Sequence, residues 1–461
     1  MSITGAFIVP HPPILLSEIG RGEEKALQAT LDAFLEVSSR IQALEPETIV
    51  LVSPHAVSYA DYFHISPGKS ARGDMAKFGA GQVSVEVLYD TVFRDMLLET
   101  VAAMSVPAGI QGSRDPSLDH GTLIPLRLLG EAVNGRLLVR LGLSGLSPLV
   151  HYKLGKCIAL AAERLKRNTV LIASGDLSHK LSHDGPYGYA PEGPQFDKSV
   201  TEAMAEGRFL DFLKFGPEFT EAAAECGLKS FIIMAGALDK KNVLSELLSY
   251  EGPFGVGYAV AAFKPAGEAQ ERNFGEQYSY WRLESAKAKH ALEGEYASLA
   301  RLSLETYVRT GKKAKLPENL PEQMLNTKAG VFVTIKKEGR LRGCIGTISP
   351  VKDCVGAEIL TNAISAGLDD TRFDPVTEDE LNELSYSVDV LEAPEPISTE
   401  AELDPKTYGV IVSAGYRRGL LLPNIAGIDT AQEQVAIAKR KAGIRDEDKA
   451  KLERFKVTRH T

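Results

Sequence analysis

An apolar run, a turn and a histidine follow one another in Thr169-Val170-Leu171-Ile172-Ala173-Ser174-Gly175-Asp176-Leu177-Ser178-His179. The residues up to Ser174 are typical of a strand buried on both faces of a sheet. Gly175-Asp176 then allows the chain to turn away, so that His179 can face a cleft. The apolar runs 5–9 and 48–52 lead in the same way to His11 and His55. Strand and helix signals alternate to about residue 263, which predicts an α/β domain with a mixed, mostly parallel sheet flanked by helices.

Histidines at the ends of three predicted strands indicate one shared site. Ligands in open α/β sheets bind outside the carboxyl ends of the strands, where several loops converge. His120 in Asp119-His120-Gly121-Thr122 and Glu225 in Ala224-Glu225-Cys226-Gly227 complete the candidate set. Two histidines and one carboxylate form the open site of many non-haem Fe(II) enzymes, and the other two histidines can move protons.

Residues 1–265 resemble the catalytic subunit of the class III extradiol ring-cleavage dioxygenases. The motifs around His11, His55, His120, His179 and Glu225 occur in the order and approximate spacing of that family. The resemblance implies Fe(II), or another divalent metal in its place, held by His11, His55 and Glu225. It also implies that His120 and His179 are acid and base groups beside a small aromatic substrate and O2.

The chemistry suggests a role for each proton-transfer residue. A catechol-like substrate must lose protons to bind a metal through both oxygens, so a neutral imidazole is a suitable base, and His179 is our candidate. His120, as its imidazolium, is the candidate donor to charge that develops on dioxygen. The acidic residues have two interpretations. Glu225 is the candidate ligand, but residues 221–225 also look like an ordinary helix start, in which either Glu221 or Glu225 has only a structural role.

The composition limits the classes of function. The chain has 461 residues, 44% of them hydrophobic, which is enough for two or three domains. A net charge of −9 argues against a nucleic-acid or anionic-membrane surface. No apolar run approaches the roughly 18 residues needed to cross a bilayer, and no secretory signal is visible, so the expected location is the cytoplasm. The four cysteines lack CxxC spacing and are expected to be reduced thiols.

A second domain is predicted after a polar segment. Residues 266–289 are charged but carry several aromatic side chains, so we expect a linker that partly packs on its neighbours. Residues 290–461 are predicted to form an α+β domain, with a helix over 291–310 and a hairpin of strands 331–335 and 340–346. The motif Leu341-Arg342-Gly343-Cys344-Ile345-Gly346 and the segments after it resemble the AMMECR family over about residues 285–461.

The motif at Cys344 has two interpretations. Arg342 could lower the pKa of the thiol, and the flanking glycines could let a ligand approach the backbone, which would make a nucleophile or small-molecule site. Alternatively, Cys344 is a buried small residue, and the glycines admit a close contact between sheet and helix. The sequence leaves both open.

The fusion of these domains is similar to the AmmeMemoRadiSam systems, in which an AMMECR-type protein A, a Memo-type protein and a radical SAM protein are associated. The resemblance implies radical SAM and Memo-type partners and a homo-oligomer. Three functions remain: an Fe(II) dioxygenase acting on a catechol-like or aminophenol substrate, a non-oxidative metal-dependent hydrolase or lyase, and a Memo-like binding protein.

Overall fold

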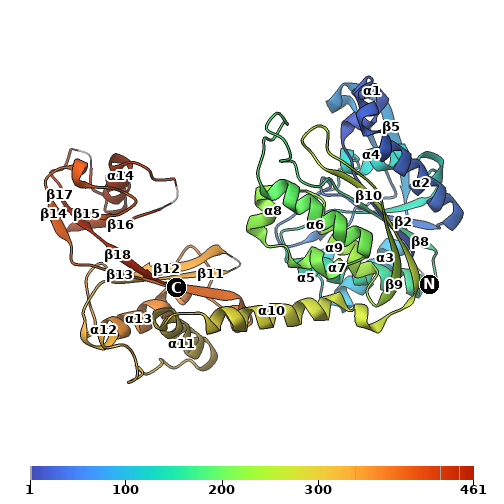
Figure 1. Cartoon of the computed structure of the whole chain (residues 1–461). Coiled ribbons are helices and arrows are strands. Elements are labelled where there is room, and N and C mark those ends of the chain that lie inside the picture. Colours follow the sequence, from blue (N-terminus) through green and yellow to red (C-terminus); the bar gives the residue numbers. More distant parts are fainter. Residues whose placement is uncertain (1–2, 338, 426, 446) are drawn as a thin grey trace. The chain divides into compact units, whose positions relative to one another are not determined.

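The chain folds into two units. The computed structural model describes residues 3–461 except 338, 426 and 446. The first unit ends at Trp281 and the second spans Arg282–Thr461 (Figure 1). Each unit has its own hydrophobic core.

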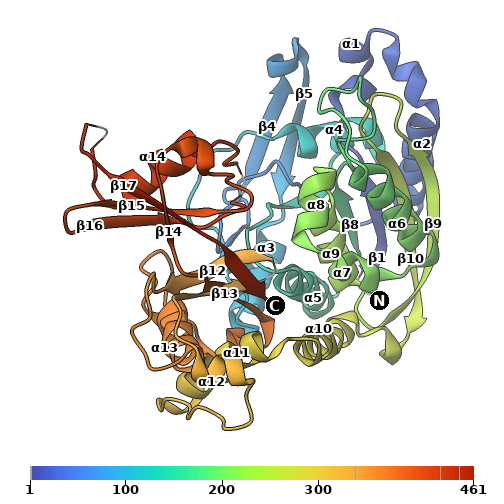
Figure 2. The same cartoon turned by 60° about the vertical axis from the view of Figure 1, so that its left-hand side comes forward.

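One large sheet forms the centre of the first unit. Its strands, with the short pair β3 and β6, are β1 (Ile3–Val9), β2 (Thr48–Val52), β3 (Phe63–His64), β4 (Ser70–Met75), β5 (Ala80–Tyr89), β6 (Ala108–Gly109), β7 (Leu137–Leu141), β8 (Thr169–Ser174), β9 (Lys241–Glu251) and β10 (Tyr258–Glu268). The order is β4-β5-β7-β2-β8-β1-β10-β9. The five strands from β5 to β1 are parallel, whereas β4, β10 and β9 pair antiparallel at the edges (Figure 2). The predicted mixed, mostly parallel sheet is confirmed.

Helices cover both faces of this sheet. They are α1 (Ser17–Gly20), α2 (Gln28–Leu44), α3 (Thr91–Ala103), α4 (His120–Leu129), α5 (Pro148–Leu165), α6 (Glu192–Glu206), α7 (Phe209–Lys214), α8 (Pro217–Ala223), α9 (Leu228–Ala237) and α10 (Phe274–Ala291). Short 3-10 helices are η1 (Pro13–Leu15), η2 (Glu23–Leu27), η3 (Ala76–Phe78), η4 (Gly130–Ala132) and η5 (Gln270–Arg272). Side chains of α3, α5, α6, α7 and α9 form the core on one face, and those of α2 and α4 on the other.

The apolar patterns of the sequence predict the burial of the central strands well and the burial of helix residues less well. Every residue of β2 and β8 is buried, as expected for strands covered on both faces. Along α2, Phe34 and Ile41 are buried, but Leu35 is 67% exposed. Leu35 is rotated by about 100° from Phe34 around the helix, so it leaves the buried stripe.

The segment 266–289 is regular structure over most of its length. It contains the end of β10, the 3-10 helix η5 and most of α10. Phe274 and Tyr278 are buried and belong to the core of the first unit. The contacts accordingly group residues up to Trp281 with the first unit.

The second unit combines helices with two antiparallel sheets, which confirms the α+β expectation. Its strands are β11 (Val331–Lys337), β12 (Arg340–Gly346), β13 (Leu384–Leu391), β14 (Glu395–Ile397), β15 (Gly409–Ala414), β16 (Arg417–Leu421), β17 (Lys451–Phe455) and β18 (Val457–His460). Its helices are α11 (Glu295–Thr310), α12 (Glu322–Asn326), α13 (Val355–Leu368), α14 (Ala431–Lys441), η6 (Glu378–Glu383) and η7 (Glu400–Glu402). The sheet orders are β12-β11-β13-β18 and β14-β17-β15-β16.

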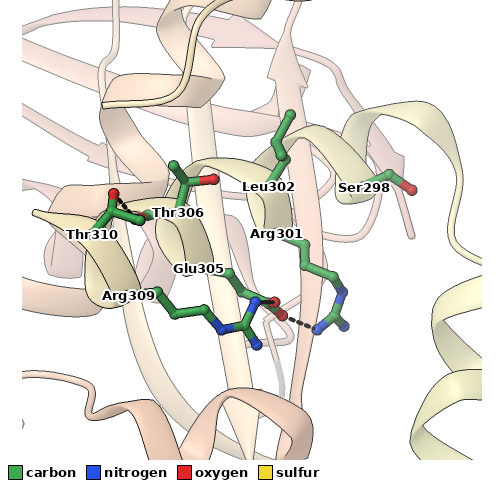
Figure 3. A pocket seen from close by; sticks show the side chains of 7 residues that line it. All are labelled: Ser298, Arg301, Leu302, Glu305, Thr306, Arg309 and Thr310. Carbon is green, nitrogen blue, oxygen red and sulfur yellow. Dashed lines mark hydrogen bonds and ion pairs between the residues drawn. The ribbon is translucent and has the colours of Figure 1, made fainter. Parts of the chain in front are cut away.

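Helix α11 carries a surface depression, and not all the leucines in and beside it are buried. Leu299 is buried, whereas Leu292, before the helix, and Leu302 are exposed. Arg301 and Arg309 both pair with Glu305 in the depression, and its lining contains none of the predicted site residues (Figure 3). Among the described residues, no helix combines the length and the apolar character that a bilayer span requires.

Candidate metal centre

The histidines that the sequence singled out come together at the carboxyl edge of the parallel strands. His11 follows β1, His55 follows β2 and His120 is the first residue of α4. The ring centroid of His55 lies 4.8 Å from that of His11 and 4.1 Å from that of His120. A ring nitrogen of His179, which follows β8, lies within 4.8 Å of the Cys226 sulfur, and that sulfur also groups with His11 and His55. The convergence expected from the strand ends is therefore observed.

Hydrogen bonds fix the orientation of the His11 ring. The Ser174 hydroxyl donates its single proton to the Gly121 carbonyl at 2.6 Å, so it accepts a hydrogen bond from Nδ1 of His11 at 2.9 Å. The proton of His11 is thereby held on Nδ1, and the lone pair is on Nε2. Nε2 lies 3.0 Å from Nε2 of His55, so both nitrogens can reach one ion.

Cys226, rather than Glu225, lies with these nitrogens. The Sγ atom of Cys226 is 3.8 Å from Nε2 of His11, and it groups with both His11 and His55 as a set of candidate ligand atoms. Asp176, His179 and Cys226 form a second, overlapping set. The Glu225 carboxylate is in neither set among the described residues and instead accepts a hydrogen bond of 2.7 Å from the Leu228 amide at the start of α9. Glu225 as a ligand stays a prediction, and the geometry offers Cys226 and Asp176 in its place.

Two unusual backbone features bring Cys226 to the site. Ala224 ends α8 in the left-handed conformation, with φ of 53°, which a residue with a side chain seldom adopts. Gly175 and Gly227 then touch, because a Cβ atom on Gly175 would collide with the Cα of Gly227. The Gly227 amide donates to the Asp176 carbonyl at 3.0 Å across this contact. The loop after β8 and the loop before α9 are thus joined beside His11.

Burial makes the cluster electrically neutral. Desolvation, followed by repulsion from neighbouring histidines, lowers the pKa of His11 and His179, and desolvation also lowers that of His55. Burial and His55 lower the pKa of His120 to about 4. Burial therefore favours the neutral imidazole of His120, and the imidazolium role stays a prediction. A neutral ring can still donate through its protonated nitrogen.

Burial also favours the neutral forms of the carboxyl groups and of the Cys226 thiol. Burial raises the pKa of Asp176 to about 7, although its hydrogen bond from the His11 amide opposes the shift. Burial raises the pKa of Glu225 to about 7 and that of the Cys226 thiol well above its usual range. Such groups favour their neutral forms until a cation neutralises their charge. The donor set therefore fits a divalent metal.

One of the four histidines has a buried ring nitrogen without a hydrogen-bond partner among the described residues. This atom is Nε2 of His179. The His179 ring lies 5.1 Å from that of Tyr187, and the ring of His120 lies 5.5 Å from that of Phe78. Tyr187 and Phe78 are both exposed, so an aromatic side chain flanks each of the two proposed proton-transfer histidines.

The candidate second site lies in the second unit. Arg342 and Cys344 lie on β12, but the Arg342 guanidinium is held by the Glu380 carboxylate at 2.9 Å. Gly343 has a packing role, because a Cβ there would collide with the Ala366 carbonyl of α13. Cys344 itself is half-buried and belongs to none of the hydrophobic clusters. The glycine therefore fits the packing interpretation, whereas the thiol does not behave as a core residue.

Comparisons with known proteins match both units. The family model described as the catalytic LigB subunit of aromatic ring-opening dioxygenase matches residues 5–261, and the AMMECR1 model matches residues 297–460. Protein CA_C1420 of Clostridium acetobutylicum is 39% identical over 100% of this chain and 99% of its own length. A Thermotoga maritima protein is 49% identical over 36% of this chain and 98% of its own length.

A solved structure is also similar to part of the chain. The uncharacterized protein PH0010 from Pyrococcus horikoshii is 33% identical, with a TM-score of 0.33, and covers 36% of this chain and 88% of its own. The two family models and the relative from Clostridium acetobutylicum show the family. The chain belongs to the family of the catalytic LigB subunit of aromatic ring-opening dioxygenases, and its second unit is an AMMECR1 domain.

Proposed function

We propose that the first unit is a non-haem Fe(II) enzyme that uses O2 to oxidise a small catechol-like or aminophenol substrate. The observation that carries this proposal is the convergence of His11, His55, His120 and His179 at one sheet edge. A structural metal would need only the ligands. The two further histidines are useful when protons must be moved at a metal-bound substrate.

The metal would be held by Nε2 of His11, Nε2 of His55 and a third group, for which Cys226 has the best geometry. When bound, Fe(II) with three protein ligands supplies free positions for substrate and O2. The hydrogen bond from Nδ1 of His11 to Ser174 keeps the lone pair of Nε2 available to bind the metal. Burial alone raises the pKa of the Cys226 thiol. A bound metal would instead favour its thiolate form.

The remaining residues would position the substrate and move its protons. The unpartnered Nε2 of His179 would accept a proton from a substrate hydroxyl, because its lowered pKa leaves it neutral at neutral pH. His120 would donate a hydrogen bond to charge that develops in the site. Phe78 and Tyr187 would pack on a planar substrate and limit the access of water.

A second candidate is a non-oxidative metal-dependent hydrolase or lyase. The position of Cys226 favours it, because a thiolate ligand suits metals such as zinc better than a carboxylate does. His179 would then be the general base beside a Lewis-acidic ion. A Memo-like binding role and association with radical SAM and Memo-type proteins, in an oligomer, remain part of the proposal through the domain fusion alone.

Oxygen uptake separates these functions. Protein purified without oxygen and loaded with Fe(II) is mixed with a panel of catechols and aminophenols while O2 is recorded. Substrate-dependent O2 consumption, with a coloured ring-opened product, supports the dioxygenase. Stoichiometric metal with no O2 consumption by any member of the panel contradicts it in favour of the non-oxidative enzyme. The H183Q variant, which changes an exposed histidine near His179, is the control.

A further inference from the structure

One face of the first sheet in the second unit carries hydrophobic side chains at one end, around Phe332 and Leu391, and polar side chains around Thr334. Val331, Val333 and Ile335 point to the buried side of β11, so Thr334 points to the opposite side. Thr334 pairs directly with Cys344 on β12 and with Ser387 on β13. Its hydroxyl lies 3.3 Å from the Cys344 sulfur. A half-buried thiol and two hydroxyl groups therefore share this part of the face.

Arg372 is fixed beside the thiol by a buried acid. Asp370, which is 6% exposed, accepts hydrogen bonds from the Cys344 amide at 2.9 Å and from two nitrogens of Arg372 at 2.9 and 2.6 Å. The Arg372 side chain is 54% exposed. Asp370 thus holds both the Cys344 backbone and the Arg372 guanidinium, and the side of the guanidinium away from Asp370 is exposed.

Arg459 is held in the same manner from the other side. Asp389, which is 1% exposed, receives two hydrogen bonds from Arg459, at 2.7 and 2.8 Å. Asp389 pairs across the sheet with Phe332 and with Arg459, so all three lie on the face of Thr334. The Arg459 side chain is 55% exposed.

Nη2 of Arg372 lies 3.4 Å from the Cys344 carbonyl oxygen, and Arg459 lies on the same face of the sheet through its pairing with Asp389. Their bonds to Asp370 and Asp389 raise the pKa values of Arg372 and Arg459, and the charge of Cys344 adds to the rise in each. The Nη1 atoms of both arginines have no hydrogen-bond partner among the described residues. Because the acids fix the guanidiniums at low entropic cost, these free donors are preorganised for an oxyanion.

The other charges near the thiol neutralise one another. Arg342 and Lys337 both pair with Glu380, and Lys337 also lies 3.4 Å from Glu383. This face is therefore not a general positive patch. A ligand would be selected by reaching the free donors of Arg372 and Arg459.

We propose that this face is a binding site for a small electrophile that carries a carboxylate or phosphate group, with Arg372 and Arg459 holding the oxyanion and Cys344 as the nucleophile. The site lies in the second unit and is independent of the metal chemistry proposed for the first. Hydroxyl groups of Thr334 and Ser387 line the same face and would contact the ligand.

Iodoacetate and iodoacetamide test the proposal, because they differ mainly in the negative charge. In either reagent the sulfur forms a bond to carbon, iodide leaves with the electrons of the broken bond, and the thiol proton goes to solvent. Peptide mass spectrometry gives the labelling rate at Cys344 at constant ionic strength. We expect the ratio of the iodoacetate rate to the iodoacetamide rate to exceed that of a free thiol by about fivefold, the factor for one charge pair at about 4 Å in water.

Arginine variants and competitors complete the test. R372Q and R459Q should lower the ratio to that of a free thiol, whereas R445Q, which changes an exposed arginine elsewhere in the unit, should not. Protection of the full-length wild-type protein by malonate assigns a carboxylate ligand, and protection by inorganic phosphate assigns a phosphate ligand. These wild-type results remain decisive if a variant does not fold. A ratio equal to that of a free thiol, or a Cys344 that neither reagent labels, overturns the proposal.

Discussion

The histidine cluster of the first unit and the sheet face around Cys344 in the second unit hold their polar groups in different ways. Around His11 the direct partners are mostly neutral: the ring donates to the Ser174 hydroxyl, and that hydroxyl donates to a carbonyl. Around Cys344 each guanidinium has its own carboxylate. Where the partners are neutral, as around His11, a lone pair is left without a cation to bind it. Where each guanidinium already has a carboxylate, as around Cys344, N–H donors are left without an anion to bind them.

This difference predicts the kind of ligand that each region accepts. Burial lowers histidine pKa values and raises those of Asp176 and Cys226, so the first cluster gains most from a metal ion. The second region already has its charges balanced, and a cation would have to displace an arginine. The following changes would sharpen or break this contrast.

The largest effect is expected from the proton-transfer histidines. H179Q and H120Q should retain the metal and lower turnover of an active substrate by about 10²- to 10⁴-fold, because proton transfer is removed while the proposed ligands remain. Steady-state rates with metal analysis of the same samples measure this. H183Q should leave both unchanged. Loss of metal from H179Q would instead place His179 among the ligands.

The third ligand is distinguished by a pair of neighbouring substitutions. C226S should weaken metal affinity by about 100-fold, more than the loss of a supporting hydrogen bond usually does. E225Q should keep the metal and cost about 1 kcal/mol of stability, because it weakens the bond to the Leu228 amide at the start of α9. Competition with a chelator gives the affinities. The opposite pattern would restore Glu225 as the ligand.

A smaller effect is expected from the residue that orients His11. S174A removes the acceptor for Nδ1 of His11 and should lower metal affinity by about 10- to 100-fold. S38A removes a comparable hydroxyl bond, to the Leu129 carbonyl, and is the matched control. Unchanged affinity in S174A would mean that the ring orientation does not depend on this hydrogen bond.

Acid should weaken the second unit through its ion pairs. Although burial acts to raise the pKa of Glu380, its bonds to Arg342 and Lys337 lower that pKa to about 2, from the ordinary value of 4.5. Since the unfolded chain binds the proton first, the stabilisation is complete above pH 4.5 and is lost as the pH falls towards 2. Hydrogen exchange of the β11 and β12 amides should report this loss. E380Q should reduce the dependence and E447Q should not; an identical slope in E380Q would contradict the assignment.

The sequence could predict the parts of the site that depend on regular structure. β1, β2 and β8 are continuous apolar runs, and a residue that follows a parallel strand must lie at the shared edge, so His11, His55 and His179 were placed correctly. The choice between Glu225 and Cys226 depends on the left-handed Ala224 and the contact of Gly175 with Gly227. No periodic pattern encodes these features. The segment Glu225-Cys226-Gly227 is the available signal, but the sequence alone does not show which of its two side chains faces the histidines.

The same limit applies to charge. The spacing of Arg342 and Cys344 suggested a direct interaction, but Glu380, 38 residues further along the chain, holds the guanidinium. Arg459, which shares the sheet face of Cys344, is 115 positions away, because β18 joins the sheet only at the end of the chain. Long-range pairing of this kind cannot be read from local motifs.

Metal content of the wild-type protein and of H11A and H55A tests the central claim most directly. The proteins are purified without oxygen, incubated with Fe(II) or Zn(II), freed of unbound metal and analysed for elements. We predict one bound ion per wild-type chain and loss of that ion from both variants, each remaining folded by circular dichroism. A wild-type protein that retains no metal, or variants that retain the full amount, would contradict a metal centre at His11 and His55.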